Sequence, residues 1–287
     1  MTNNSQTPNS KRKLFFGLFI FPLVIAVGMA LMLCTVVFLT SEKETPETLI
    51  GSIKSGSPSK RWQKAFELSN ELNRPNSTYL RNTALMNEII SIARDTQHFD
   101  VKTRVYMTIA LSHFNTPASI KALQESLNDE SDELRIYSIW SLGVLRDKSS
   151  APLIARFLKS DSPDIKKMAL YAIGVLGDEK YWDPIKPLLD DAVADVRWNA
   201  ALSLARLGSD AGYDILIQML DRKTYAALGP ITEQEIEAAM INAIKGLALI
   251  HKPKSITILS TVSKQEQNMN VRQTAIDAIK IIEKSLK

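Results

Sequence analysis

The sequence predicts an all-α protein in which one transmembrane helix precedes an α-solenoid of about seven helical hairpins. Three observations predict this architecture. A long uncharged apolar run lies near the N-terminus, a helix-periodic segment recurs along the rest of the chain, and no stretch alternates like a strand. The resulting boundaries are an N-terminal tail at 1–13, a transmembrane helix at 14–39, a linker at 40–45 and a solenoid at 46–287.

Composition limits the classes of function. The chain has 287 residues, of which 45% are hydrophobic, and this is enough for an extended core. Its single cysteine excludes an intramolecular disulfide, and three histidines leave little material for a zinc site. Lys11–Lys13 supply three of the 35 basic residues, and the other 32 nearly balance 31 acidic residues. We expect no nucleic-acid partner, because such binding needs a clustered basic surface.

The first element is the run from Leu14 to Leu39, which has 26 residues and no charge. As a helix it is roughly 39 Å long, enough to cross a ~30 Å hydrocarbon core with some tilt. A cleaved signal peptide usually has an apolar stretch of about 7–15 residues followed by a small-residue cleavage site. This run is longer and ends in Thr40-Ser41-Glu42, and Leu33 precedes Cys34 where a lipoprotein needs a small residue. The sequence therefore predicts a retained span.

The charges beside the span predict its orientation. Lys11-Arg12-Lys13 precedes it, whereas Glu42, Glu44 and Glu47 follow it with Lys43 as the only nearby base. Basic flanks stay in the cytoplasm. We therefore expect a cytoplasmic tail at 1–13 and an extracytoplasmic solenoid, in a bacterial inner membrane facing the periplasm.

The next elements are repeats. ELRIYSIWSLGVL from Glu133, DIKKMALYAIGVLG from Asp164 and DVRWNAALSLARLG from Asp195 follow one another at intervals of 31 residues. Weaker copies begin at Lys60, Asp100, Glu235 and Asn270, which makes seven. Apolar residues at offsets of three and four make each copy a helix, and a second apolar helix separates successive copies. Such pairs cannot bury their apolar faces alone and must stack on one another.

Local signals mark the ends of these helices. Pro152 and Pro184 lie in first helical turns, where a missing backbone donor costs little. Gly177 and Gly208 are expected to end their helices, and Thr232 with Glu235 predicts a capping box for the sixth copy.

The pattern Asp-Val-Arg-x-x-Ala-Ala-x-x-Leu-x-x-Leu-Gly from Asp195 resembles the short HEAT repeats of the phycobilisome-lyase type. The copies at Glu133 and Asp164 match it well, the other four match it loosely, and the resemblance covers about 46–287. It implies a right-handed α-solenoid whose second helices, the ones with this motif, line the concave side.

Stacking the copies exposes a charged column. Its acidic members stand at helix starts, at Asp100, Glu133, Asp164, Asp195 and Glu235. Its basic members stand two repeat positions later, at Arg61, Lys102, Arg135, Lys166, Arg197 and Arg272, and Glu237 breaks this series. These bases form either a track for an anionic ligand or a ladder of intramolecular pairs, and the matched numbers of acids and bases favour the ladder.

A second column predicts a binding surface. Five positions beyond the bases stand large apolar residues, namely Phe66, Met107, Trp140, Tyr171 and Leu202. By helical period they lie opposite the main buried stripe, so we expect an apolar strip for a partner in the concave groove, widened by Trp62 and Trp198. The alternative is that these side chains only pack between neighbouring second helices.

One insertion interrupts the spacing. The fifth and sixth copies start 40 residues apart, and TYAALGPITEQ occupies the excess within 223–234. A long loop on a rigid scaffold carries binding residues in many proteins, and a tolerated insertion without function fits equally well.

The sequence contains no motif that indicates a known enzymatic activity. The deoxyhypusine hydroxylases, whose architecture is similar, bind iron through His-Glu pairs, but here the histidines precede Phe99, Phe114 and Lys252. No nucleophile elbow or glycine-rich phosphate loop is present. We therefore expect no catalytic residue, no metal and no cofactor.

These observations predict a membrane-anchored, non-catalytic scaffold or adaptor that binds a protein or peptide in its concave groove. Because the linker at 40–45 is short, we expect the partner to lie near or within the bilayer, as part of a membrane-embedded complex. Two alternatives stay open: an enzyme or pigment-handling factor of the phycobilin-lyase or hydroxylase kind, and a structural spacer with an empty groove.

Overall fold

The computed structural model describes residues 16–40, 44–75, 77–226 and 228–286. The chain divides into two compact units, Met1–Thr45 and Pro46–Lys287. The predicted tail at 1–13, the first two residues of the predicted span and part of the predicted linker lie outside the described residues.

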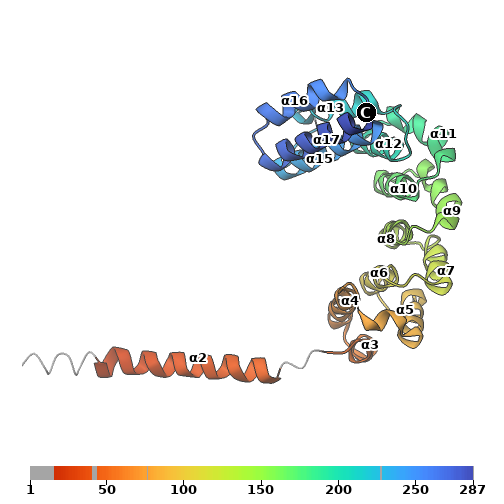
Figure 1. Ribbon diagram of the computed structural model, residues 1–287. Coiled ribbons are helices and arrows are strands. Elements are labelled where there is room, and N and C mark those ends of the chain that lie inside the picture. The colour runs from red at the N-terminus through yellow and green to blue at the C-terminus, as the bar shows by residue number, and fades with distance from the viewer. Residues whose placement is uncertain (1–15, 41–43, 76, 227, 287) are drawn as a thin grey trace, which may run out of the picture. The chain divides into compact units, whose positions relative to one another are not determined.

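The described part of the first unit is a π-helical turn, Phe16–Ile20, that continues into α2, Phe21–Thr40 (Figure 1). Pro22 lies in the first turn of α2, directly after the π-helical turn, and as a proline it has no backbone N–H to donate. The helix from Gly17 to Val36 is long and apolar enough to cross a membrane by length and composition, and none of it is buried against the protein. A signal sequence would pass the same test.

The second unit consists of helices, and no β-strand occurs among the described residues. Its described residues form seven hairpins, each with a first and a second helix. The first four pair α3 (Pro46–Ser55) with α4 (Pro58–Leu72), α5 (Thr83–Arg94) with α6 (Val101–Leu111), α7 (Pro117–Ser126) with α8 (Asp132–Val144), and α9 (Ala151–Ala155) with α10 (Pro163–Leu176). The others pair α11 (Trp182–Ile185) with α12 (Ala194–Arg206), α13 (Tyr213–Gln218) with α15 (Glu233–Ile250), and α16 (Ser255–Gln265) with α17 (Met269–Ser285).

Shorter elements complete the hairpins. Five are 3₁₀ turns, at Thr78–Arg81, Lys148–Ser150, Arg156–Lys159, Glu179–Tyr181 and Lys186–Asp190. The insertion carries a further turn, α14 (Lys223–Ala226). All seven predicted copies fall on second helices, which confirms the helical repeat.

Within this second unit the second helices form the inner row of a curved stack and the first helices the outer row (Figure 1). Each second helix packs against the second helix of the next hairpin, from α4 through to α17. The core consists of two clusters of buried side chains, one from α3 to α12 and the other from α12 to α17, so that α12 contributes to both. The inner row is therefore the surface that the repeats present together.

Small residues allow the inner helices to approach closely. A Cβ atom on Gly143 of α8 would lie 3.3 Å from the Cβ of Ala172 in α10, and one on Gly174 of α10 would lie 2.9 Å from the Oγ of Ser203 in α12. Ser203 in turn donates a hydrogen bond to the backbone carbonyl of Leu170. This contact recurs at the same repeat positions, which explains why small residues stand there.

Local signals set the helix ends as expected. Gly177 and Gly208 have φ angles of 72° and 83°, in the left-handed region that ends helices. Thr232 and Glu235 form the predicted capping box. Ser131 and Ser162 cap α8 and α10 by accepting hydrogen bonds from the amides of Leu134 and Ile165.

Candidate functional site

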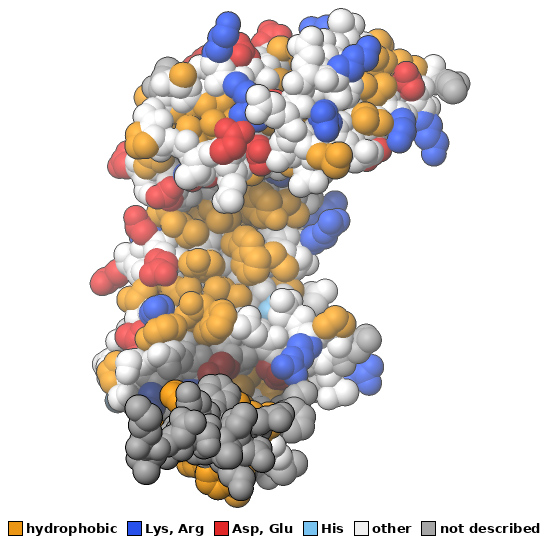
Figure 2. Space-filling model, turned by 90° about the vertical axis from the view of Figure 1, so that its left-hand side faces the viewer, with side chains coloured by type: hydrophobic (Ala, Val, Ile, Leu, Met, Phe, Trp, Pro, Cys, Tyr) orange, Lys and Arg blue, Asp and Glu red, His pale blue; other side chains and the backbone are white. Residues whose placement is uncertain are grey.

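The concave face of the solenoid unit is the candidate site. Figure 2 shows hydrophobic side chains gathered across the middle of this face. Acidic side chains border the apolar strip on one side in that view, and basic side chains are found on the other. Successive second helices pack side by side and run in the same direction because the hairpins repeat, so their N-termini lie along one edge of the strip and their C-termini along the other.

A hollow of about 400 Å³ lies in this face between α8, α10 and α12. Its apolar lining comes from Ile136, Met168 and Tyr171. Its polar lining comes from Asp164, Lys167 and Asn199. The hollow is open to solvent and combines an apolar floor with charges at one end, which suits an amphipathic ligand.

Lys167 is the charged centre of the hollow. Its Nζ lies 2.9 Å from a carboxylate oxygen of Asp164 and 3.4 Å from one of Asp195, so it joins α10 to α12. Burial lowers the pKa of Lys167, but the hydrogen bond and the charge of Asp164, followed by those of Asp195, outweigh burial and raise it. Lys167 is therefore an ammonium ion at neutral pH.

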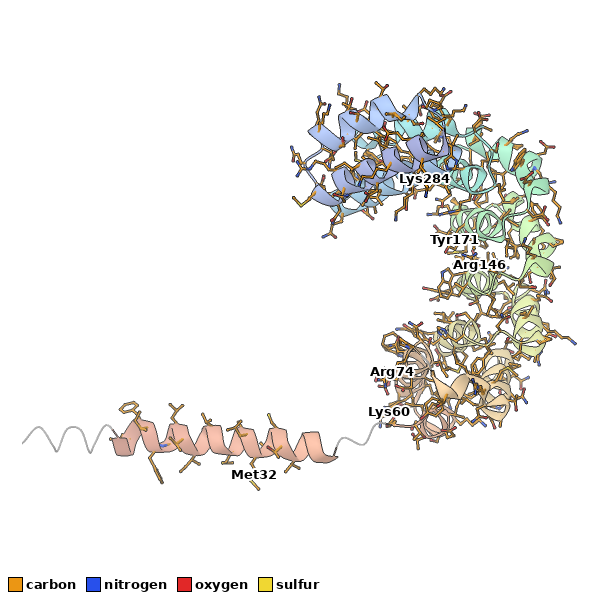
Figure 3. The ribbon with its side chains drawn as sticks, viewed as in Figure 1. Met32, Lys60, Arg74, Arg146, Tyr171 and Lys284 are labelled. Carbon is orange, nitrogen blue, oxygen red and sulfur yellow. The ribbon has the colours of Figure 1, made fainter. Side chains whose placement is uncertain are left out.

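Tyr171 of α10 and Trp140 of α8 are the two aromatic residues of the predicted column in the central second helices. Both side chains are half-buried, and Trp140 occupies on α8 the repeat position that Tyr171 occupies on α10. Figure 3 places Tyr171 on the concave side of the unit. The guanidinium carbon of Arg206 lies 5.3 Å from the centre of its ring, within the range of a cation–π interaction. This contact holds the ring at the rim of the strip.

Aromatic side chains also gather on α4 and α6. Phe66 is 45% exposed, and its ring contacts Tyr106 edge-on with 5.4 Å between ring centres. Trp62 stacks on Tyr106 at 6.4 Å, and the Nζ of Lys102 lies 3.4 Å from the centre of the Trp62 ring. Sequence reasoning missed Tyr106. The available signal was an aromatic residue directly before Met107 in the predicted column.

Three members of the predicted surface are buried, so the prediction of an unbroken apolar strip is wrong at these positions. Met107 is enclosed in the core, and Tyr106 takes the half-exposed place on α6. Leu202 packs against Gly246 of the following second helix, α15. Trp198 is covered by Tyr225, whose ring meets it edge-on at 5.3 Å.

The insertion therefore packs into the solenoid. Tyr225 of α14 is among the largest fully buried side chains, and its hydroxyl donates a hydrogen bond of 2.6 Å to the carbonyl of Met219. Next to it, Arg222 forms ion pairs of 2.6 Å with both Glu233 and Glu266. These contacts tie the insertion to the last hairpin.

The basic column is largely engaged within the protein. Arg61 donates to the carbonyl of His98 at 2.6 Å, Arg197 to that of Asp191 at 2.7 Å, and Arg135 to that of Asp129 at 3.1 Å. Lys166 pairs with the carboxylate of Asp191 at 2.5 Å. These bases hold the loops between first and second helices, which favours the intramolecular ladder over an anion track, although most partners are loop carbonyls.

Within residues 16–40, 44–75, 77–226 and 228–286 no group of three or more His, Cys, Asp or Glu side chains is placed to hold a metal ion.

Comparisons with known proteins identify the repeat. Residues 150–228 match the family model described as HEAT repeats. No curated protein matches the chain. Among solved structures, a chain in the complex of CpcE and CpcF of phycocyanin lyase from Nostoc sp. PCC7120 is similar, with 18% identity and a TM-score of 0.56 over 85% of this chain and 96% of that chain.

The structure of YibA from Escherichia coli is also similar, with 16% identity and a TM-score of 0.49 over 83% of this chain and 93% of that chain. At such identities the likeness to the Nostoc protein is one of fold alone. It agrees with the resemblance to short HEAT repeats of the phycobilisome-lyase type that the motif predicted. Residues 150–228 are thus similar to HEAT repeats, and the described part of the second unit has the fold of an all-α helical-repeat solenoid.

Proposed function

We propose that this chain is a membrane-anchored, non-catalytic adaptor that holds a protein or peptide segment in the concave groove of a right-handed solenoid. The observation that carries the proposal is the apolar strip on the concave face, with its hollow beside Tyr171 (Figure 2). A stacked surface of this kind is formed before binding, so a partner meets little ordering cost on the protein side. Trp140 and Tyr171 are the anchors, because half-buried aromatic rings dominate many interfaces.

In this proposal the helix from Gly17 to Val36 is the membrane anchor. It is a retained transmembrane span, and the solenoid lies outside the cytoplasm. The linker of 40–45 keeps the partner close to the membrane. We expect the full chain to stay in the membrane pellet after alkaline extraction, and protease added outside intact spheroplasts to digest the solenoid. A mature protein that begins after residue 40 contradicts the anchor.

Site-specific photocrosslinking in cells tests the groove. A photoreactive phenylalanine analogue replaces Trp140 or Tyr171 on the concave face, and Leu153, an exposed apolar residue of the first helix α9, serves as the matched control. We expect one discrete crosslinked product from the two groove positions and none from Leu153. Equal products from all three positions, or none from the groove, contradict the proposal.

Alanine variants then measure how much Trp140 and Tyr171 contribute to partner binding. Trp140→Ala and Tyr171→Ala each reduce capture of that partner by about tenfold or more, as truncated aromatic hot spots do. Circular dichroism confirms that the variants fold. Undiminished capture by folded variants removes these residues from the site. The alternative of pigment handling has only likeness of fold behind it, and a coloured purified protein would favour that alternative.

A further inference from the structure

Three acidic side chains line one edge of the concave strip. Glu133, Asp164 and Asp195 occupy the same repeat position at the N-terminal ends of α8, α10 and α12. The structure leaves all three exposed, with 70% of the Asp164 side chain accessible to solvent. Asp164 also lines the hollow, so this edge borders the apolar surface directly.

These acids are not used as helix caps. In other repeats the acid at this position caps its own helix: Asp100 accepts a 2.9 Å hydrogen bond from the Thr103 amide, and Glu235 completes the Thr232 capping box. In α8 and α10, serines take over that role, at Ser131 and Ser162. Helix capping therefore does not require the carboxylates of Glu133 and Asp164, and in α12 the N-cap Val193 makes no side-chain hydrogen bond, so Asp195 does not cap its helix either.

Few bases neutralise this edge. Among the described residues Glu133 has no ion-pair partner, and Asp164 and Asp195 share the single ammonium of Lys167. The neighbouring bases of the charged column, Lys166 and Arg197, are bound to Asp191 and its loop. The edge formed by Glu133, Asp164 and Asp195 thus carries a net negative charge.

The opposite edge carries the opposite charge. Arg146 follows the C-terminus of α8, is exposed, and lies on the concave side (Figure 3). Arg206 at the C-terminal end of α12 contacts the Tyr171 ring. A ligand lying along the groove thus meets carboxylates on one flank and guanidinium groups on the other, with the apolar strip between them (Figure 2).

We propose, on the basis of the proposed function, that the occupant of the groove is an amphipathic peptide segment with lysine or arginine along one flank. Its apolar side chains lie on Ile136, Met168 and Tyr171, with one entering the hollow. Its basic flank lies against Glu133, Asp164 and Asp195. Complementary charges of this kind set the orientation and selectivity of binding more than its total strength.

Three synthetic peptides test this inference on the full chain in phosphatidylcholine nanodiscs. They have the same length and the same leucine positions, and carry lysine, glutamine or glutamate at the remaining positions. Fluorescence anisotropy measures binding, with empty nanodiscs as the blank. We expect the lysine peptide to bind about tenfold tighter than the glutamate peptide at low salt, and the preference to shrink at high salt.

The decisive variant replaces the edge by neutral isosteres, Glu133→Gln with Asp164→Asn and Asp195→Asn. It should abolish the lysine preference. The matched control changes net charge equally on the outer row, through Glu179→Gln, Asp183→Asn and Asp190→Asn, all exposed. It should keep the preference. If the groove variant fails to fold, Glu133→Gln alone should reduce the preference about twofold.

The outcomes separate the two proposals. Equal or tighter binding of the glutamine or glutamate peptide overturns the basic-flank inference but leaves a peptide-binding groove. Loss of the lysine preference in the outer-row control overturns it too, since the effect then comes from net charge. If none of the peptides binds, the inference fails, and photocrosslinking at Trp140 and Tyr171 decides the proposed function separately.

Discussion

Arg146 adopts the left-handed backbone conformation that glycine adopts at the same position of the next two repeats. Its φ angle is 53°, and the residues at the same position of the next two repeats are Gly177 and Gly208. The amide of Arg146 donates to the carbonyl of Gly143 at 3.0 Å, and the amide of Asp147 to that of Leu142 at 3.3 Å, so the turn has the same role as in its neighbours. An L-residue here costs free energy that glycine avoids.

The first prediction concerns this residue. Arg146→Gly should raise the free energy of unfolding by about 1 kcal/mol, because it relieves the left-handed backbone. Gly177→Ala, the matched control, should lower it by about the same amount. Urea titration followed by circular dichroism measures both. If Arg146→Gly is less stable than the natural chain, the arginine side chain makes a stabilising contact that outweighs the strain.

At the scale of elements, the spacing between helices depends on where a side chain can be accommodated. A Cβ atom on Gly212, at the start of α13, would lie 2.5 Å from the Cα of Ala201 in α12. That neighbour is backbone and cannot move aside. Gly51, within α3, has open space around the position of a Cβ atom. Gly212 is therefore required for the close approach of α12 and α13, whereas Gly51 is not required by packing.

The second prediction compares these glycines. Gly212→Ala should lower the free energy of unfolding by about 3 kcal/mol, because α12 and the α13 hairpin must separate. Gly51→Ala should raise it by about 1 kcal/mol, because alanine favours an exposed helix interior. Thermal unfolding of both variants is the measurement. A neutral Gly212→Ala would mean that the two helices are not held at this separation.

The third prediction concerns the insertion. Tyr225→Ala should lower the free energy of unfolding by about 4 kcal/mol through the cavity it leaves, and should expose Trp198. Tyr225→Phe keeps the ring and loses the hydrogen bond to Met219, so it should cost only about 1 kcal/mol. If Trp198 becomes exposed, its fluorescence should shift to the red in Tyr225→Ala and not in Tyr225→Phe. Repeating the measurement in chains that also carry Trp198→Phe shows which part of the signal comes from Trp198. Equal spectra in the two variants count against the covering role.

Over the whole solenoid unit, stability is the sum of contacts between neighbouring hairpins. The last two hairpins are joined partly by Arg222 and Glu266, and the Glu266 side chain is only 7% exposed. The hydrogen bonds from Arg222 lower the pKa of Glu266, and its burial only partly opposes them. An ionised Glu266 therefore stabilises the attachment of α16 and α17.

The fourth prediction follows from this pair. The pKa of Glu266 in the folded chain lies below its value in the unfolded chain. Its contribution to the free energy of unfolding is therefore complete above the ordinary carboxyl pKa, and it is lost as the pH falls through the lower pKa of the folded chain. Glu266→Gln should lower the free energy of unfolding by about 1–2 kcal/mol at neutral pH, less than for a fully buried ion pair because Arg222 is partly exposed. It should also make the free energy of unfolding less dependent on pH in the acid range. Hydrogen exchange in α16 and α17 measures it, with α8 as the internal reference. Equal exchange in the variant would contradict the link.

Much of the architecture follows from local properties of the chain. Apolar spacing, caps and helix-ending glycines act within a few residues, so the seven second helices, the Thr232 capping box and the turn at Gly177 were predictable from the sequence. The length and apolarity of α2 are equally local. Stacking follows because each hairpin leaves one face unburied.

Exposure within the predicted column depends on neighbours distant in sequence. Equivalent positions share an environment within the hairpin, but Leu202 is covered by α15 and Trp198 by Tyr225 of the insertion, while Tyr171 is covered by neither. Helical period tells which side of a helix a residue occupies, and it cannot tell what the next hairpin places there. Tertiary packing alone therefore reduced the predicted strip to Trp140, Tyr171 and the aromatic cluster around Phe66, and brought Asp164, Lys167 and Asp195 together beside it.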